Sequence, residues 1–245
     1  MHRLNPGVDR LPGLPARLTG AGGLNPAAPT HSMKKYLVEF IGTFFLVFTI
    51  GTTVIAPGAG AMAPLAIGSV LAVMIFAGGH VSGGHFNPAV TIGVWLRGKC
   101  PAGDDAPYLG AQTAAALVAS FAVKALKTGL VAKAAALTGA MSPEILPALL
   151  AEFLFTFALV WVVLNVATAK GTQGNSFYGA AIGLTVTAGA YAVGGISGAV
   201  FNPAVAVGAC LMGLIAWGSI WIYLVACFAA AVVAATVYKI VNGAD

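Results

Sequence analysis

The chain has 245 residues, of which 59% are hydrophobic and only 8% are charged, and its net charge is +5. Soluble domains carry about 25% charged residues, so this composition excludes a soluble enzyme, a nucleic-acid-binding protein and a disordered regulator. It is typical of an integral membrane protein. The basic residues are scattered, so we interpret the net charge as a result of membrane topology and expect no nucleic-acid partner.

The N-terminal segment differs from the rest of the chain. Residues 1–32 contain five prolines, five glycines and four charged side chains, with no apolar run long enough for a signal peptide or a helix. Met33 is followed by two lysines and then by the first long apolar run. We therefore expect residues 1–33 to form a disordered extension, and translation from Met33 would give a compact membrane protein with a basic N-terminus.

Six apolar stretches reach the length of about 20 residues that a helix needs to cross a bilayer. They cover roughly residues 36–56, 63–80, 107–126, 147–167, 177–195 and 215–240. Two shorter apolar segments, 86–97 and 201–212, each follow a glycine-rich turn and contain Asn-Pro near their start, a pair that suits the first turn of a helix. They predict half-helices entered from loops inside the membrane. Unwound backbone at that depth must be buried in protein or line a water-filled cavity, which implies a pore or a binding site.

The sequence contains an internal repeat. LVEFIGTFFLVF around Glu39 matches LAEFLFTFALVW around Glu152, 113 positions later. VSGGHFNPAVTIG around Asn87 matches ISGAVFNPAVAVG around Asn202, 115 positions later. Each half has three spanning helices, and an odd number makes the second half enter from the opposite face of the membrane.

These features predict an all-α membrane protein with six transmembrane helices and two re-entrant half-helices in an inverted repeat. We expect the first repeat at residues 34–130, a connecting loop at 131–146 and the second repeat at 147–245.

The basic residues favour a cytoplasmic location for both termini. With that orientation nine Lys and Arg side chains lie inside and three outside, or six and three without the extension. The inner set is Arg3, Arg10, Arg17, Lys34, Lys35, Arg97, Lys99, Lys170 and Lys239, and the outer set is Lys124, Lys127 and Lys133.

Two Asn-Pro-Ala triplets, Asn87-Pro88-Ala89 and Asn202-Pro203-Ala204, are the strongest functional signal. In an inverted repeat the two half-helix N-termini face each other near the midplane, each with unpaired N–H groups and about half a positive charge. The asparagine amides add further donors. A neutral molecule with lone pairs is favoured there, whereas a cation is repelled. One triplet alone carries little weight, because Asn25-Pro26-Ala27 occurs in the extension.

On these motifs the chain resembles the major intrinsic protein family, the aquaporins and aquaglyceroporins. The resemblance covers residues 34–242, and GHVSGGHFNPAVTIGVWLRG at 79–98 is similar to bacterial water-type aquaporins throughout. It implies a homotetramer of independent pores in the cell membrane. Each pore would carry water and small neutral solutes passively in both directions, without a cofactor.

Glu39 and Glu152 lie in the first helix of each half. A carboxylate at such depth costs about 2.5–3.5 kcal/mol, so each needs a partner. One interpretation is a proton relay in a coupled transporter. The other is structural, with each carboxylate accepting N–H bonds from a re-entrant loop, and the resemblance favours it.

The glycine turns before the triplets supply further candidates. His80 and His85 flank the first turn; we expect them to brace the loop, because no third ligand lies nearby to complete a metal site. The resemblance implies that backbone carbonyls of both turns line the pore. By position these belong to Gly83, Gly84, His85, Gly198, Ala199 and Val200.

The chain departs from the family at the outer constriction. Counted from the motif asparagines, its four positions fall on Ile67, Ala190, Ala199 and Val205. The family usually has Arg at the last position, where it supplies a fixed charge and several donors. Without it we expect a wide apolar ring that admits larger or less polar solutes such as glycerol, urea, ammonia or hydrogen peroxide and excludes ions less strictly. Glycerol channels typically have Asp where this chain has Ala206, so this position looks like the water type. Tyr223 and Leu224 match neither type, and the sequence therefore does not decide between water and glycerol.

Other functions remain as alternatives at this stage. A secondary transporter also uses inverted repeats and broken helices, but it needs a coupling site, for which only Glu39 and Glu152 qualify. A weakly selective ion pore is another alternative, because the arginine that would repel cations is missing. An enzyme is disfavoured because no catalytic pair converges. Cys100, Cys210 and Cys227 show no CxxC pair, and we expect them to be packing residues.

Overall fold

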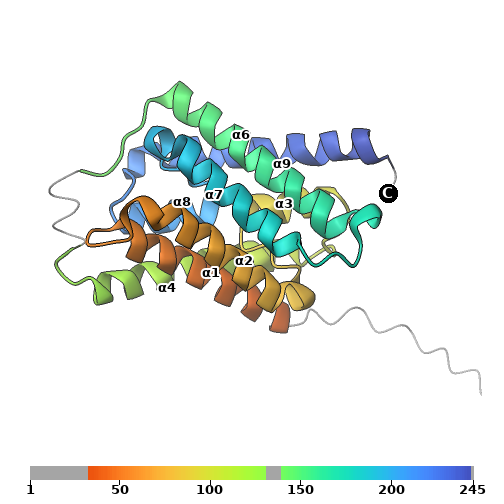
Figure 1. Cartoon of the computed structure of the whole chain (residues 1–245), viewed down its shortest axis with the longest axis horizontal. Helices are drawn as coiled ribbons and strands as arrows, with labels where there is room; N and C mark the ends of the chain where they lie inside the picture. Colours follow the sequence, from red (N-terminus) through yellow and green to blue (C-terminus); the bar gives the residue numbers. More distant parts are fainter. Residues whose placement is uncertain (1–32, 131–138, 244–245) are drawn as a thin grey trace, which may run out of the picture. The chain divides into compact units, whose positions relative to one another are not determined.

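The computed structural model describes residues 33–130 and 139–243. The predicted disordered extension and most of the predicted connecting loop lie outside these residues. The long helices are α1 (Met33–Val54), α2 (Ala63–Ser82), α4 (Asp105–Leu126), α6 (Ile145–Val163), α7 (Tyr178–Ser197) and α9 (Ile220–Asn242), and the short ones are α3 (Pro88–Leu96) and α8 (Pro203–Leu211) (Figure 1). Short 3-10 helices occupy Gly60–Met62, Lys170–Thr172 and Trp217–Ser219, and a π-helical turn extends α6 over Leu164–Thr168.

Six helices of the described chain are long and apolar enough to cross a membrane. With the adjoining 3-10 and π-helical turns included, they coincide with the six predicted spans, with ends that differ by at most three residues. The two half-helices have nine residues each, about half of what a span requires. No strand forms in the described ranges. The predicted fold class is confirmed.

The packing of the helices repeats between the two halves. Helix α1 lies against α4, and α6 lies against α9 in the same way. Each half-helix packs on the last helix of the other half, α3 on α9 and α8 on α4. Helices α2 and α7 pack on each other where the halves meet. This exchange brings both half-helices into the middle of the bundle.

Two glycines allow α2 and α7 to approach each other closely. A Cβ on Gly68 would collide with Thr187 Oγ1 and the carbonyl of Gly183, and one on Gly183 would collide with the carbonyl of Gly68. Small residues at helix crossings are the usual means of bringing membrane helices together. The two positions are 115 residues apart, so the contact belongs to the repeat.

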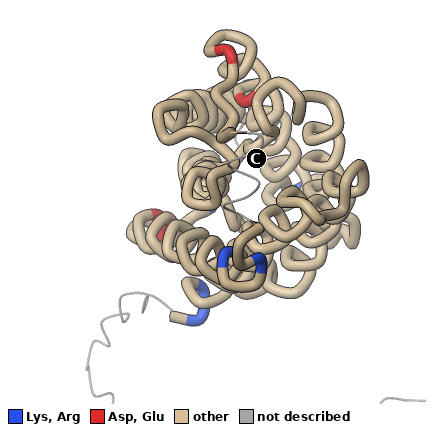
Figure 2. The backbone as a smooth tube through the Cα atoms, turned by 90° about the vertical axis from the view of Figure 1, so that its left-hand side faces the viewer, with Lys and Arg blue, Asp and Glu red and all other residues tan. Residues whose placement is uncertain are grey.

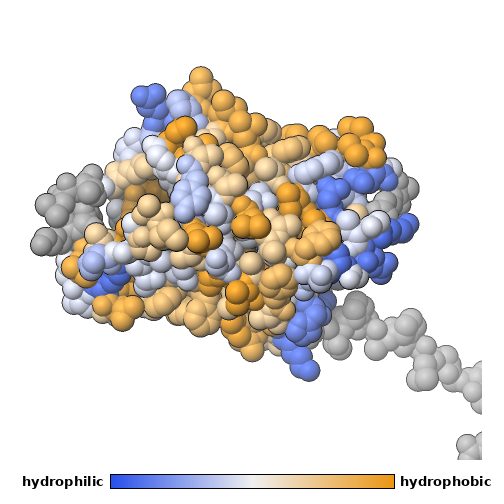
Figure 3. All heavy atoms as spheres, viewed as in Figure 1, coloured by the Kyte–Doolittle hydropathy of each residue, from blue (hydrophilic) through white to orange (hydrophobic). Residues whose placement is uncertain are grey.

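The outer surface suits a lipid environment. Apolar side chains cover most of the middle of the face shown in Figure 3, and hydrophilic ones gather towards its ends. Leu146, Phe121 and Val225 are among the large apolar residues that are more than half exposed. Charged residues are few, as the backbone view in Figure 2 shows. The start of α1 and the end of α9 lie at the same end of the bundle, as an even number of spans requires (Figure 1).

Candidate functional site

The two loops before the half-helices, which we call the first corner (residues 83–87) and the second corner (198–202), have the same backbone conformation. A left-handed glycine directly follows each of the helices α2 and α7, and two further left-handed residues come after it in each corner. They are Gly83, Gly84 and Phe86, at φ 92°, 64° and 49°, and Gly198, Ala199 and Phe201, at φ 89°, 53° and 50°. Such φ values are rare outside glycine, so their repetition shows that both corners are built to one plan.

Each motif asparagine caps the half-helix that follows it. The side-chain oxygen of Asn87 accepts the Ala89 N–H at 2.9 Å, and that of Asn202 accepts the Ala204 N–H at 2.9 Å. Both asparagines have extended backbone and precede the proline of the first helical position. The caps use donors that a helix start otherwise leaves unpaired.

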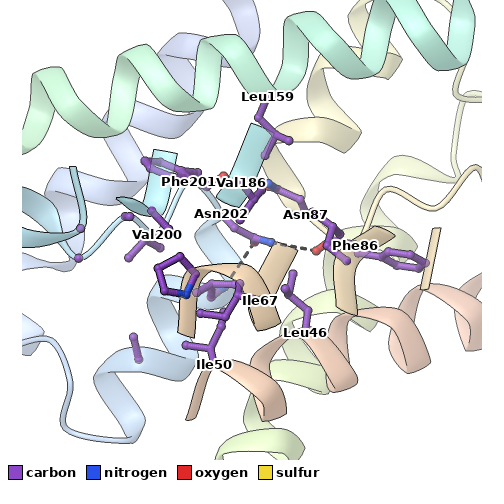
Figure 4. Close-up of a pocket in the computed structure, with 18 of the residues that line it drawn as sticks. Leu46, Ile50, Ile67, Phe86, Asn87, Leu159, Val186, Val200, Phe201 and Asn202 are labelled. Carbon is purple, nitrogen blue, oxygen red and sulfur yellow. Dashed lines mark hydrogen bonds between the residues drawn. The ribbon is translucent and has the colours of Figure 1, made fainter. Parts of the chain in front are cut away.

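The same asparagines join the two corners. Asn87 Nδ2 donates to the carbonyl of Phe201 at 2.8 Å, and Asn202 Nδ2 donates to the carbonyl of Phe86 at 2.9 Å. Figure 4 shows Asn87 and Asn202 side by side at the meeting point. One amide proton of each side chain is thus used between the repeats, and each half-helix start is fixed relative to the other.

The buried carboxylate of Glu39 organises the first corner. Its Oε1 accepts the Ser82 hydroxyl at 2.7 Å and the His85 N–H at 2.9 Å. Its Oε2 accepts the Phe86 N–H at 2.7 Å and the Gln112 side-chain amide at 2.8 Å. Four donors therefore satisfy one carboxylate that has no exposed surface.

Glu152 does the same for the second corner with three donors. Its Oε1 accepts the Ser197 hydroxyl at 2.6 Å and the Val200 N–H at 2.9 Å, and its Oε2 accepts the Phe201 N–H at 2.7 Å. Neither carboxylate lines either of the two cavities described below. This geometry fits the structural interpretation and leaves the proton-relay interpretation without a group that faces solute.

Two tyrosines, which the sequence did not single out for this role, complete the frame. Tyr108 on α4 donates its hydroxyl to the carbonyl of Ser82 at 2.7 Å, and Tyr223 on α9 donates to the carbonyl of Ser197 at 2.6 Å. They are 115 positions apart, the offset of the Asn-Pro-Ala triplets, so the repeat held the signal that identifies them.

The first corner carries an additional polar cluster. His85 Nδ1 lies 3.1 Å from Thr91 Oγ1, and Gln112 Nε2 donates to the same oxygen at 3.0 Å. The expected bracing of the loop by His85 therefore runs through Thr91 and Gln112, two residues that the sequence did not single out. His80 is exposed and lies nearer the surface. Among the described residues, no three His, Cys, Asp or Glu side chains are grouped as a metal site requires.

A cavity of about 300 Å³ lies along the two corners. Its wall includes Asn87 and Asn202 together with all four predicted constriction residues, which are Ile67, Ala190, Ala199 and Val205. Figure 4 shows the largely apolar side chains that line it. Of the described side chains in this wall, only those of Asn87, Asn202 and His85 are polar.

A second cavity of about 720 Å³ opens towards the end of the bundle where α1 begins. Its wall is more polar and includes Lys35, His80, Lys99 and Lys170. Of the predicted carbonyl residues, Gly84, Gly198, Ala199 and Val200 lie on the first cavity, Gly83 lies on the second and His85 lies on both. His85 and Val163 are the residues that the two cavities share, so they mark where the cavities meet.

Known proteins share this architecture. The family model of the major intrinsic proteins matches residues 26–238. The chain is 37% identical over 218 residues to glycerol uptake facilitator protein-like 6 of Lactiplantibacillus plantarum, a match that covers 87% of this chain and all of that protein. It is 35% identical to aquaporin NIP1-4 of Oryza sativa, covering 86% of this chain and 77% of the relative. It is also 35% identical to aquaporin AqpM of Methanothermobacter thermautotrophicus, covering 84% and 96%.

A solved structure agrees with these sequence matches. The aquaglyceroporin of Plasmodium falciparum superimposes with a TM-score of 0.72 at 24% identity, over 84% of this chain and 95% of that one. At this identity the likeness shows the fold, while the family model and the sequence relatives show descent. The chain belongs to the major intrinsic protein family.

Proposed function

We propose that solutes cross the membrane through the two joined cavities, past the Asn-Pro-Ala corners, and that the chain is a passive channel for water and small neutral solutes. Proteins of this family are channels and not enzymes, and named relatives include aquaporins and a glycerol uptake facilitator. The observation that carries the proposal is the meeting of both asparagines on one cavity wall.

The midplane favours neutral molecules with lone pairs. Each asparagine uses one amide proton on the opposite corner and keeps the second for a solute. The positive ends of α3 and α8 converge on the same point, which disfavours Na⁺ and hydronium. A water or polyol oxygen exchanges its hydration for these donors without a charge penalty.

The outer constriction favours solutes less polar than water. Ile67, Ala190, Ala199 and Val205 bring neither a charge nor a side-chain donor to the cavity that they line. We assign glycerol, urea, ammonia and hydrogen peroxide to the permeant class along with water. A weakly selective ion pore is the second candidate, because Val205 supplies no charge that repels cations. A coupled transporter has no support, since protein donors occupy both buried carboxylates.

We further assign the chain to the cell membrane as a homotetramer with both termini in the cytoplasm. The distribution of Lys and Arg supports this orientation, because six of the nine basic residues that follow residue 32 lie on the side of the termini.

Stopped-flow shrinkage of proteoliposomes with a panel of osmolytes, together with conductance in planar bilayers, tests the proposal. Ala190→Trp places an indole in the constriction and should abolish solute flux. Leu184→Trp on the same helix is the control, because Leu184 is 60% exposed to the lipid side. Equal flux through both variants would contradict the assignment of the path. Cation conductance in the parent would favour the ion pore, and saturable gradient-coupled uptake would favour a transporter.

A further inference from the structure

His85 occupies the point where the two cavities meet. It lines both of them and is 8% exposed. Val163, which also lines both cavities, is apolar. Among the described residues, His85 therefore provides the one side chain at the junction that can form hydrogen bonds. What a passing solute meets there depends on which ring nitrogen carries the proton.

The hydrogen bonds behind the ring decide this question. Gln112 Nε2 has two protons, and it donates one to the Glu39 carboxylate at 2.8 Å and one to Thr91 Oγ1 at 3.0 Å. The reverse orientation of the amide would bring its oxygen against the carboxylate, so the orientation is fixed. Thr91 Oγ1 donates its single proton to the carbonyl of Asn87 at 3.1 Å.

Thr91 Oγ1 therefore has only a lone pair left for His85 Nδ1, which lies 3.1 Å away. The ring nitrogen must be the donor in that contact. This assignment satisfies every contact around the threonine oxygen, with two accepted bonds and one donated bond. With the proton on Nε2 instead, Nδ1 could only accept, so Thr91 would have to donate its proton to the ring and would lose its bond to the Asn87 carbonyl.

We propose that this chain of bonds holds neutral His85 with its proton on Nδ1, so that Nε2 presents a lone pair to solutes at the junction of the cavities. Nε2 has no hydrogen bond to a described residue and lies beside Gly83, 3.1 Å from where a Cβ on that glycine would stand. His85 is then a specificity-determining acceptor for solutes with N–H or O–H groups, such as urea and glycerol. This inference rests on the proposed path.

Among the described residues, a side-chain acceptor of this kind exists on one side of the midplane only. The positions of the second half that correspond to His85, Thr91 and Gln112 are Val200, Ala206 and Cys227. A solute that passes the asparagines towards the second cavity thus finds donors at the midplane and an acceptor next to them. The lone pairs of the solute accept hydrogen bonds from the asparagines first, and its N–H or O–H groups then donate to His85.

Nitrogen-15 NMR of histidine-labelled protein in lipid at pH 8 tests the tautomer directly, and His85→Phe identifies the His85 signals. We expect a protonated Nδ1 and an unprotonated Nε2 in the parent. Thr91→Ala, which copies Ala206 of the second corner, should shift the population towards protonated Nε2. A parent spectrum with the proton on Nε2 would overturn the proposal.

Flux measurements test the role of the lone pair. Loss of one hydrogen bond in His85→Phe should lower urea and glycerol permeability roughly three- to tenfold, and Thr91→Ala should lower it about twofold. His85→Gln, which keeps a polar group at the Nε2 position, should recover part of the loss. A folded His85→Phe protein with parental permeability would refute the acceptor role. If the parent itself shows no flux, the proposed path fails while the NMR result still decides the tautomer.

Discussion

The two corners of the repeat share one frame and differ in what surrounds it. Both have the same left-handed backbone, a buried glutamate under the loop, a serine and a tyrosine at the helix end, and an asparagine that reaches the other corner. The polar residues His85, Thr91 and Gln112 lie in or next to the first corner, whereas the corresponding positions of the second half hold Val200, Ala206 and Cys227. Because the second corner keeps the same backbone conformation without them, the loop shape does not require these polar residues, and we attribute them to the proposed solute path.

The polar cluster has an energetic cost. Gln112 Oε1 and Thr43 Oγ1 are buried without a hydrogen-bond partner among the described residues. In the second half Thr156 Oγ1, at the position that corresponds to Thr43, lies 3.3 Å from Cys227 Sγ. An unpaired buried polar group costs about 1–3 kcal/mol, so the first corner gives up stability that the second corner retains.

The largest effect on stability should come from replacing the glutamates, because each carboxylate accepts several hydrogen bonds from one corner. Glu39→Gln and Glu152→Gln each replace an acceptor oxygen with an amide that faces donors. We expect both variants to lose most folded protein, with Glu39→Gln worse by about 1–3 kcal/mol because Gln112 is then left opposite another amide. Thermal unfolding in detergent and membrane yield measure this.

A second variant isolates the reason for that difference. Gln112→Cys copies the second corner at position 112, so the gap between the two glutamate variants should disappear in its background. If the gap persists, the fourth donor on Glu39 is not what separates the corners.

The asparagines should have the next largest effect, and an equal one in the two corners. Asn87→Ala and Asn202→Ala each remove a helix cap and the bond to the opposite corner, which together should cost about 2–3 kcal/mol. Permeability should fall as well, since a midplane donor is lost. Asn242→Ala at the end of α9 is the control, because its side-chain amide donates to Tyr238 and Asn165, which belong to neither corner. Unchanged folding and flux in both corner variants would contradict the midplane assignment.

The sequence predicted those parts of the molecule that have a local pattern or a repeat. Spans follow from apolar length, half-helices from Asn-Pro after glycine, and the glutamates and asparagines from duplication. Gln112 and Thr91 were missed because a single polar residue in an apolar helix has no local signature, and its partners come from other helices. The reciprocal bonds of the asparagines were missed for a similar reason: they depend on the distance between two loops that lie over a hundred residues apart.

A third prediction concerns selectivity at the start of α8, just after the second corner, where Val205 lies on the cavity and is buried. Val205→Arg adds the positive charge and bulk that the resemblance led us to expect at this position. Glycerol and urea permeability should fall roughly tenfold, any cation leak should fall too, and water flow should drop only modestly. Val205→Met adds bulk without charge, so it should reduce glycerol flux and leave a cation leak in place. A folded arginine variant with parental glycerol, urea and ion permeability would mean that residue 205 does not face the solute path.

The smallest expected effect concerns Ala199, which stands at φ 53° where the first corner has Gly84 at φ 64°. A left-handed conformation costs a residue with a Cβ about 1–2 kcal/mol, whereas glycine adopts it freely. Glycine also loses more backbone entropy on folding, about 0.4–1 kcal/mol, which offsets part of the gain. Ala199→Gly should therefore stabilise the protein by roughly 0.5 kcal/mol and raise the unfolding temperature by about 1–2 °C.

The reverse change in the first corner should be clearly unfavourable. In Gly84→Ala the new Cβ would lie 3.3 Å from the Gly79 Cα, in addition to the left-handed strain. At position 199 the existing Cβ lies 4.0 Å from where a Cβ on Gly194 would stand and lines the cavity, so its removal relieves strain and widens the constriction slightly. Glycerol flux through Ala199→Gly should thus rise by a small factor while stability increases. A lower unfolding temperature for Ala199→Gly would mean that packing of the methyl group, and not backbone strain, decides the residue at this place in the second corner.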